Sequence, residues 1–145
     1  MTLTDHFTLD ELTRSSTATR LGIDNSVPQI MIPRLFVLAS GLEQIRALLG
    51  FPLHIDSGWR CQALNAAVGG ARDSAHMQGY AADFVCPAFG DPLSIVKSIE
   101  ASDITFDQCI QEGGAWVHIS FNPMQRRELL TAHFAAQGVT YRVGV

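Results

Sequence analysis

Apolar residues recur at helical spacing over one long stretch in the first half of the chain. In PRLFVLASGLEQIRALLG they fall on every third or fourth position: Leu35, Leu38, Leu42, Ile45 and Leu49. This period places them on one face of a helix. Pro33 suits the first turn of such a helix, and Gly50 suits the stop at its C-terminal end. The pattern therefore predicts a long core helix from Pro33 to Gly50.

The segment before this helix carries one capping signal and several breakers. HFTLDELTRSS predicts a short helix, with Thr8 as N-cap and Glu11 three residues later as its capping-box partner. STATRLGIDNSVP contains glycine, asparagine and proline, which predicts a loop.

After the long helix, short apolar segments alternate with glycine-containing turns. We predict strands in FPLHIDSGWR, YAADFVCP, ITFDQCIQE and AWVHISF, and GVTYRVGV is a candidate edge strand. Gly113–Gly114 indicates a hairpin between the third and fourth of these strands. Helices are expected in CQALNAAVG and in DPLSIVKSIEAS, which Asp91 caps.

This order of elements predicts one α+β domain over residues 1–145, with helices packed on a small, mainly antiparallel sheet. Residues 1–27 form its N-terminal helix and loop, and residues 28–145 form its core. The chain is 47% hydrophobic and 17% charged, which is typical of a globular protein. Its net charge of −4 and scattered basic residues argue against a nucleic-acid partner. We expect a monomer.

The sequence gives little indication of a targeting signal. MTLTDHFTLDEL lacks the basic and apolar regions of a secretory signal, so we expect synthesis in the cytoplasm without a signal peptide. Prolines and charged residues interrupt the longest apolar stretch, so membrane insertion is not expected. The three cysteines, Cys61, Cys86 and Cys109, have no C-x-x-C spacing, which favours a reducing compartment at synthesis.

Two histidines and an aspartate form the candidate chemistry. SAHMQGYAADF carries His76 and Asp83, and AWVHISF carries His118 between β-forming residues. Two histidines and one carboxylate are a ligand set of catalytic zinc, with the fourth position left for water. Taken singly, His118 also fits a hydrogen-bonded core histidine and Asp83 a strand-start residue. The other histidines, His6, His54 and His133, lack such company and are expected to be structural or exposed.

The surrounding motifs resemble those of a known family. SGWRCQALNAAVGGARDSAHMQGYAADF and, downstream, FDQCIQEGGAWVHISF resemble the zinc D-alanyl-D-alanine carboxypeptidases. These peptidoglycan metallopeptidases share a fold with hedgehog signalling domains and vancomycin-resistance D,D-peptidases. The N-terminal HFTLDELTRSSTATRLGIDN is similar to the opening of phage and prophage members. The resemblance thus extends over nearly the whole chain.

The resemblance implies a role for several residues. It places the ligands of one Zn²⁺ at His76, Asp83 and His118, and a substrate-binding, charge-stabilising arginine at Arg60. Ser74 matches a small polar residue that lines the site and binds substrate. Arginine suits this role because its guanidinium group is planar, stays charged and can bind a carboxylate or a developing oxyanion.

The expected general base departs from the family pattern. Many relatives carry an acid three residues before the second histidine, where this chain has Ala115. Glu112, six residues before His118 and across the glycine turn, is our candidate base, because neighbouring strands of a hairpin lie about 5 Å apart. The rival interpretation makes Glu112 a surface charge and leaves proton transfer to Asp107 or to water.

Other residues near the motifs have weaker claims. Trp116 is expected to line a substrate cleft, although core packing also accounts for Trp116 or Trp59. Cys61 and Cys109 lie near motif positions, and we expect them to be small buried residues rather than zinc ligands.

The predicted function is hydrolysis of peptide bonds in peptidoglycan stem peptides, at D-Ala–D-Ala, at L-Ala–D-Glu or at a D,D cross-link. The protein would then act on the cell wall, as a phage endolysin or a virion-borne peptidase. A second hypothesis, which Ala115 favours, is an inactive zinc-holding phage structural or wall-binding protein. A third is a small domain whose histidines never meet.

Overall fold

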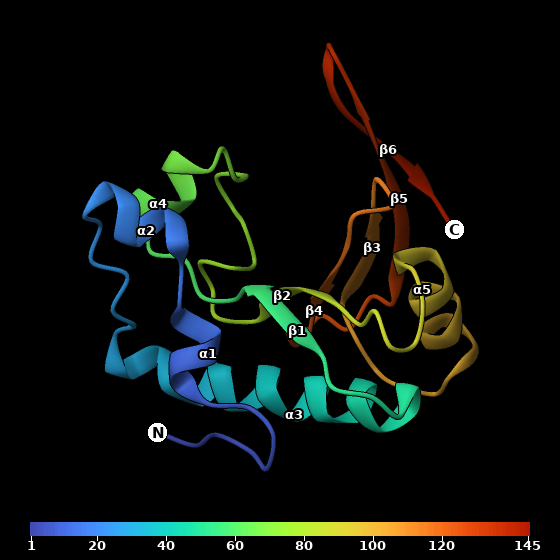
Figure 1. Ribbon diagram of the computed structural model, residues 1–145, viewed down its shortest axis with the longest axis horizontal. Coiled ribbons are helices and arrows are strands. Elements are labelled where there is room, and N and C mark those ends of the chain that lie inside the picture. Colours follow the sequence, from blue (N-terminus) through green and yellow to red (C-terminus); the bar gives the residue numbers. More distant parts are fainter.

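The computed structural model describes residues 1–145, which form helices and one sheet in an α+β arrangement (Figure 1). The helical segments are α1 (Leu9–Thr13), α2 (Ser16–Leu21), the 3-10 turn η1 (Gln29–Met31), α3 (Ile32–Leu49), α4 (Gln62–Ala67) and α5 (Pro92–Ala101). The strands are β1 (His54–Ser57), β2 (Ala81–Val85), β3 (Gln108–Glu112), β4 (Trp116–Ser120), β5 (Glu128–Ala135) and β6 (Gly138–Val143).

All six strands join one sheet in the order β1-β2-β4-β3-β5-β6. Every neighbouring pair is antiparallel except β3 and β5, which run parallel. The predicted fold class, helices packed on a mainly antiparallel sheet, is confirmed. No helix has both the length and the apolar character that a bilayer span requires.

The N-terminal segment confirms one prediction and corrects another. Thr8 caps α1, since its hydroxyl accepts a hydrogen bond from the Glu11 N–H at 3.1 Å. The predicted loop over STATRLGIDNSVP is wrong in its first half, which forms α2. Ser15 caps this helix, and Gly22 ends it in the left-handed conformation at φ 68°. The glycine read as a loop signal is therefore a helix C-cap.

The remaining elements lie close to their predicted positions, with two additions, the 3-10 turn η1 and the strand β5. The long helix α3 ends at Gly50, and the hairpin of β3 and β4 turns at Gly113–Gly114. The strand β5 was not predicted, and it inserts between β3 and the edge strand β6. Its partner β3 lies before β4 in the chain, so no local hairpin pattern marks this parallel pairing.

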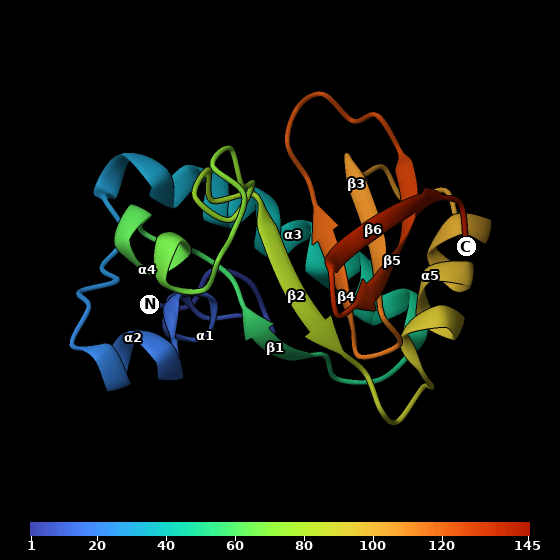
Figure 2. The same ribbon diagram turned by 90° about the horizontal axis from the view of Figure 1, so that it is seen from above.

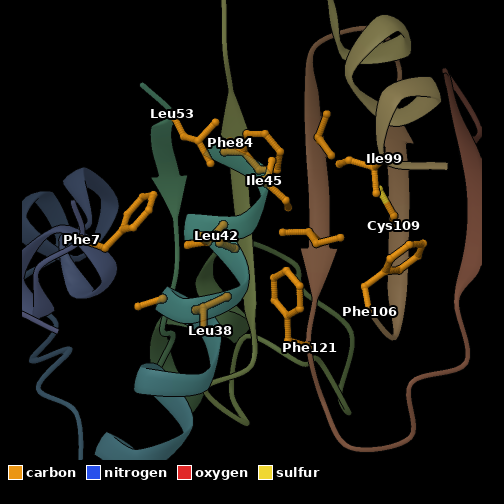
Figure 3. Packing of buried hydrophobic residues seen from close by; sticks show 14 of the residues in the cluster. Phe7, Leu38, Leu42, Ile45, Leu53, Phe84, Ile99, Phe106, Cys109 and Phe121 are labelled. Atoms are coloured by element: carbon orange, nitrogen blue, oxygen red, sulfur yellow. The ribbon is translucent and has the colours of Figure 1, made fainter. Parts of the chain in front are cut away.

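The core lies between one face of the sheet and the helices α3 and α5. Figure 3 shows side chains of α3 directed at the sheet, and its labelled residues include Leu38, Leu42 and Ile45 of α3, Phe84 of β2, Cys109 of β3 and Phe121, which follows β4. Alternation along the strands explains which face each residue takes. In β2, Ala82 and Phe84 join the core, so Asp83 faces the opposite side.

The sheet face away from α3 is left open for a site. Figure 2 shows this face, with α4 and the loop that follows it on one side and β6 crossing over the other. Asp83 pairs with His118, and Glu112 pairs with Trp116, so all four side chains share this face. The topology therefore gathers residues from three strands above one surface.

Candidate metal centre

Three side chains converge on the open face as a potential metal site. One ligand atom from each of His76, Asp83 and His118 can be chosen so that all lie within 4.8 Å of one another. The Asp83 Oδ1 atom lies 2.9 Å from His118 Nδ1 and 3.3 Å from His76 Nε2. Two imidazoles and a carboxylate form a donor set suited to Zn²⁺. The residues present therefore fit a zinc ion.

The sheet and one glycine fix the orientation of the three groups. Asp83 and His118 are direct cross-strand partners on β2 and β4. His76 lies in the loop before β2, where its Nδ1 donates to the Gly58 carbonyl at 2.7 Å. That hydrogen bond sets the tautomer and leaves Nε2 directed at Asp83. Burial lowers the pKa of His76, which favours the neutral ring that binds metal.

A methyl group at Gly58 is expected to disturb this support. A Cβ there would lie 2.3 Å from the Leu12 carbonyl oxygen, a backbone atom that cannot rotate away. Gly58→Ala should therefore cost roughly 1–3 kcal/mol of unfolding free energy and weaken zinc binding. Urea unfolding and metal titration measure both. Gly90→Ala, whose Cβ would find only ordinary contact at 3.4 Å, is the control. Equal stability of the two variants would contradict the packing argument.

Arg60 supports the aspartate of the cluster from the side of α4. Its guanidinium donates to Asp83 Oδ2 at 3.4 Å, to Asn65 Oδ1 at 3.1 Å and to Ser57 Oγ at 3.2 Å. An arginine has five N–H donors, so two remain for another group. Because Arg60 also lines the cavity described below, those donors are available to a ligand.

The electrostatics of Asp83 favour its charged form. Burial raises its pKa, but the neighbouring imidazoles of His76 and His118 outweigh burial and hold the pKa well below its ordinary value. A carboxyl group that stays ionised when buried is available to a cation without first losing a proton.

This depressed pKa gives a pH dependence of stability. An acid whose folded pKa is lowered stabilises the fold above its unfolded pKa, near 3.8, and loses that contribution as pH falls toward the folded value. Metal-free Asp83→Asn should be less stable than wild type by roughly 3 kcal/mol at pH 7, with the gap narrowing below pH 4. Urea unfolding between pH 7 and 3 tests this, with the exposed Asp103→Asn as control. A gap that is constant down to pH 3 would refute it.

Glu112 lies in the same cavity as the metal cluster. The side chain is 8% exposed and projects from the end of β3 on the face that carries His118. Burial raises the pKa of Glu112, the nearby His118 lowers it and Asp83 raises it, with a net upward shift. Glu112 is thus no surface charge, whereas Ala115, at the family's usual acid position, is exposed on the turn.

Asp107, the rival candidate for proton transfer, is engaged elsewhere. Its Oδ1 accepts from the Arg126 backbone N–H at 3.0 Å and from Nε at 2.9 Å, while Oδ2 accepts from Nη2 at 2.9 Å. The hydrogen bond from Arg126 lowers the pKa of Asp107 against the opposing effect of burial. An ion-paired carboxylate with a low pKa is a poor proton acceptor, so the geometry favours Glu112.

The cluster opens into a cavity of about 940 Å³. Its lining includes two other residues predicted for the site, Ser74 and Trp116. The Ser74 hydroxyl accepts a hydrogen bond from the His76 N–H at 3.2 Å, which leaves its own proton free for a ligand. The Trp116 ring packs against Phe134 with centroids 5.5 Å apart. Clefts of this volume hold small peptides and drug-sized molecules.

The histidines and cysteines for which no site role was predicted lie outside the cavity. His54 and His133 are exposed, and His6 forms an ion pair with Glu43 at 2.8 Å. The Cys61 thiol accepts from the Leu64 N–H as the N-cap of α4. Cys109 faces the apolar core, where burial raises the pKa of its thiol.

The sequence interpretation missed one residue that supports the site and one group of residues that lines the cavity. Asn65, buried on α4, holds Arg60 through Oδ1 and donates to the Ala71 carbonyl at 2.8 Å. A polar residue at an apolar helical position was its available signal. The others come from the C-terminal strands: Leu130, Phe134, Val139 and Tyr141. No local motif marks these residues, because the unpredicted strand β5 brings them to the cavity.

Comparison with known proteins identifies the family of the chain. The family model described as Peptidase M15 matches residues 5–120, which include every residue of the metal cluster together with Arg60 and Glu112. A search of curated proteins gives no match. Since the match covers well over half of the chain, this protein belongs to the Peptidase M15 family, a zinc D-Ala-D-Ala carboxypeptidase-like family.

Proposed function

We propose that this protein is a zinc-dependent peptidase that hydrolyses peptide bonds in bacterial peptidoglycan. The observation that carries the proposal is the joint placement of the His76–Asp83–His118 cluster, Arg60 and Glu112 around one open cavity. Family membership supports peptidase activity, and the donor set supports zinc. One Zn²⁺ per chain would be held by the three cluster residues.

Bound zinc in such a site supplies Lewis-acid polarisation of a carbonyl and lowers the pKa of water to about 7. Glu112 would accept the proton of the attacking water and return it to the leaving amine. A base of this kind works best with a pKa near the operating pH, so its upward shift is favourable. Glu112 is buried, which also limits its contact with bulk water.

Arg60 would bind the substrate while it holds the metal ligand. Its two uncommitted N–H groups would donate to a peptide carboxylate or to the oxygen on which negative charge develops. Ser74 would donate its hydroxyl proton to the same substrate, and the Trp116 ring would form part of the wall beside it. These roles are consistent with the hydrogen bonds and the cavity lining described above.

The second candidate is a zinc-holding protein without activity that serves a phage as a structural or wall-binding component. The feature that favours it is Ala115 at the usual acid position.

Under the leading proposal the protein acts on the cell wall as a phage lysin or virion-associated enzyme, with stem peptides as its partners.

Digestion of purified peptidoglycan separates the two candidates. Wild-type protein should release new amino termini, and the product masses would identify the scissile bond among D-Ala–D-Ala, L-Ala–D-Glu and cross-links. The Arg60→Ala variant should release far fewer termini. Zinc-loaded wild type that releases none would favour the inactive protein.

A further inference from the structure

The chain beyond the family match adds a wall to the cavity. Residues 128–143, comprising β5, β6 and the turn between them, follow the matched segment that ends at residue 120. We call this segment the C-terminal arm. Figure 1 shows its far end rising beyond the rest of the sheet. Four of its side chains line the cavity: Leu130, Phe134, Val139 and Tyr141.

One row of paired residues connects the C-terminal arm with the strands that carry Glu112 and Trp116. Trp116 pairs with Glu112, Glu112 with Ala132, and Ala132 with Tyr141. Paired residues of neighbouring strands share a face, so all four side chains stand on the cavity side. Adjacent strands lie about 4.8 Å apart, which places Tyr141 two strand spacings from Glu112. The intervening Ala132 is buried and does not line the cavity, whereas Glu112, Trp116 and Tyr141 do.

The hydroxyl of Tyr141 is free to bind. It makes no hydrogen bond with any other residue of the protein, and 58% of the residue is exposed. Partial burial raises the pKa of the phenol, and the charges of Glu112 and Asp83 raise it further. The phenol is therefore a neutral hydrogen-bond donor at neutral pH, close enough to Glu112 and Asp83 for their charges to act on it. Arg60 also lines the cavity, but it lies beside β2, toward the opposite edge of the sheet from β6.

We propose that the C-terminal arm is a substrate-recognition element and that Tyr141 is its polar contact. The Tyr141 hydroxyl donates a hydrogen bond to a carbonyl or carboxylate oxygen of the bound peptide, on the side of the reacting bond away from Arg60. Phe134 and Val139 provide the apolar surface around that contact. The inference rests on the proposed peptidase function and adds a second anchoring point for its peptide substrate.

Removal of a single oxygen atom tests the contact. Tyr141→Phe keeps the ring and should lower kcat/KM for soluble peptidoglycan fragments about 10- to 100-fold, the value of one hydrogen bond to a charged or developing-charge partner. The chain has one other tyrosine, Tyr80, whose ring contacts Arg34 outside the cavity. Tyr80→Phe is thus a matched control, with kcat/KM expected near that of wild type. Equal kcat/KM for Tyr141→Phe and wild type would overturn the inference.

A binding measurement makes the test independent of turnover. In Glu112→Gln protein with ring-labelled tyrosine, soluble peptidoglycan fragments should shift the Tyr141 ring resonances and leave those of Tyr80 in place. The two phenylalanine variants assign the resonances. Binding that leaves Tyr141 unshifted would overturn the inference even if the wild type cleaves. Shifted Tyr141 resonances with no cleavage by wild type would instead refute only the peptidase function. Absence of both binding and cleavage would reject both.

Discussion

Replacement of Glu112 by glutamine is expected to lower turnover by about 10²–10⁴-fold, the usual size of a general-base effect, without loss of zinc. Glutamine keeps the shape of the side chain and removes its ability to accept a proton. The residue lies in the cavity with the metal cluster, and it is not one of the three potential ligands. Turnover of peptidoglycan fragments and metal content per chain measure the two quantities.

The pH profile gives this prediction a second readout. A base must be deprotonated to act, so activity should fall as pH falls through the pKa of Glu112, which burial raises above its ordinary 4.5. That acidic limb should be missing from the residual activity of Glu112→Gln. Glu100→Gln, at an exposed position on α5, is the control for the change itself. Near-normal turnover in Glu112→Gln would assign the base elsewhere.

His118→Ala should lose both zinc and stability, because the ion would tie β4 to β2 and to the loop that carries His76. Binding at a thousandfold excess over the dissociation constant stabilises a fold by about 4 kcal/mol, and that contribution would disappear. Chelation of zinc from the wild type should lower its Tm toward that of the variant. Differential scanning calorimetry with and without chelator provides the measurement.

The control for this variant is His133→Ala, which removes an exposed histidine of β5 outside the cavity. It should retain zinc and respond to the chelator as the wild type does. Full zinc retention and an unchanged Tm in His118→Ala would refute the ligand assignment.

Local patterns account for most of the fold. The apolar period of α3, the caps at Thr8 and Asp91 and the Gly113–Gly114 turn each act over a few residues, and the structure has all of them. The errors have local and non-local causes. Gly22 stops a six-residue helix that is too short to show an apolar period, so α2 read as loop. β5 pairs in parallel with a strand far from it in the chain, which no turn signal reports.

Some site residues can likewise be predicted from local sequence patterns, and others depend on contacts between distant segments. His76, Asp83 and His118 were found through residue types and motif spacing. The register of β2 with β4 explains why Asp83 and His118 meet, and the hydrogen bond to the Gly58 carbonyl directs His76 at them. Asn65 and Tyr141 were missed because their roles depend on what other segments bring beside them. Tyr141 reaches the cavity only because β5 lies between β3 and β6 and carries an alanine in the row beside Glu112.

Zinc titration of metal-depleted protein, with peptidoglycan cleavage measured at each addition, tests directly whether this protein is a zinc-dependent peptidase. We expect no cleavage without zinc and a linear rise in cleavage that ends at one equivalent per chain, with the Tm rising over the same range. Cleavage by the metal-free protein would contradict the zinc-dependent mechanism. Uptake of one zinc with no cleavage at any point would contradict the peptidase function and leave a metal site that only stabilises the fold.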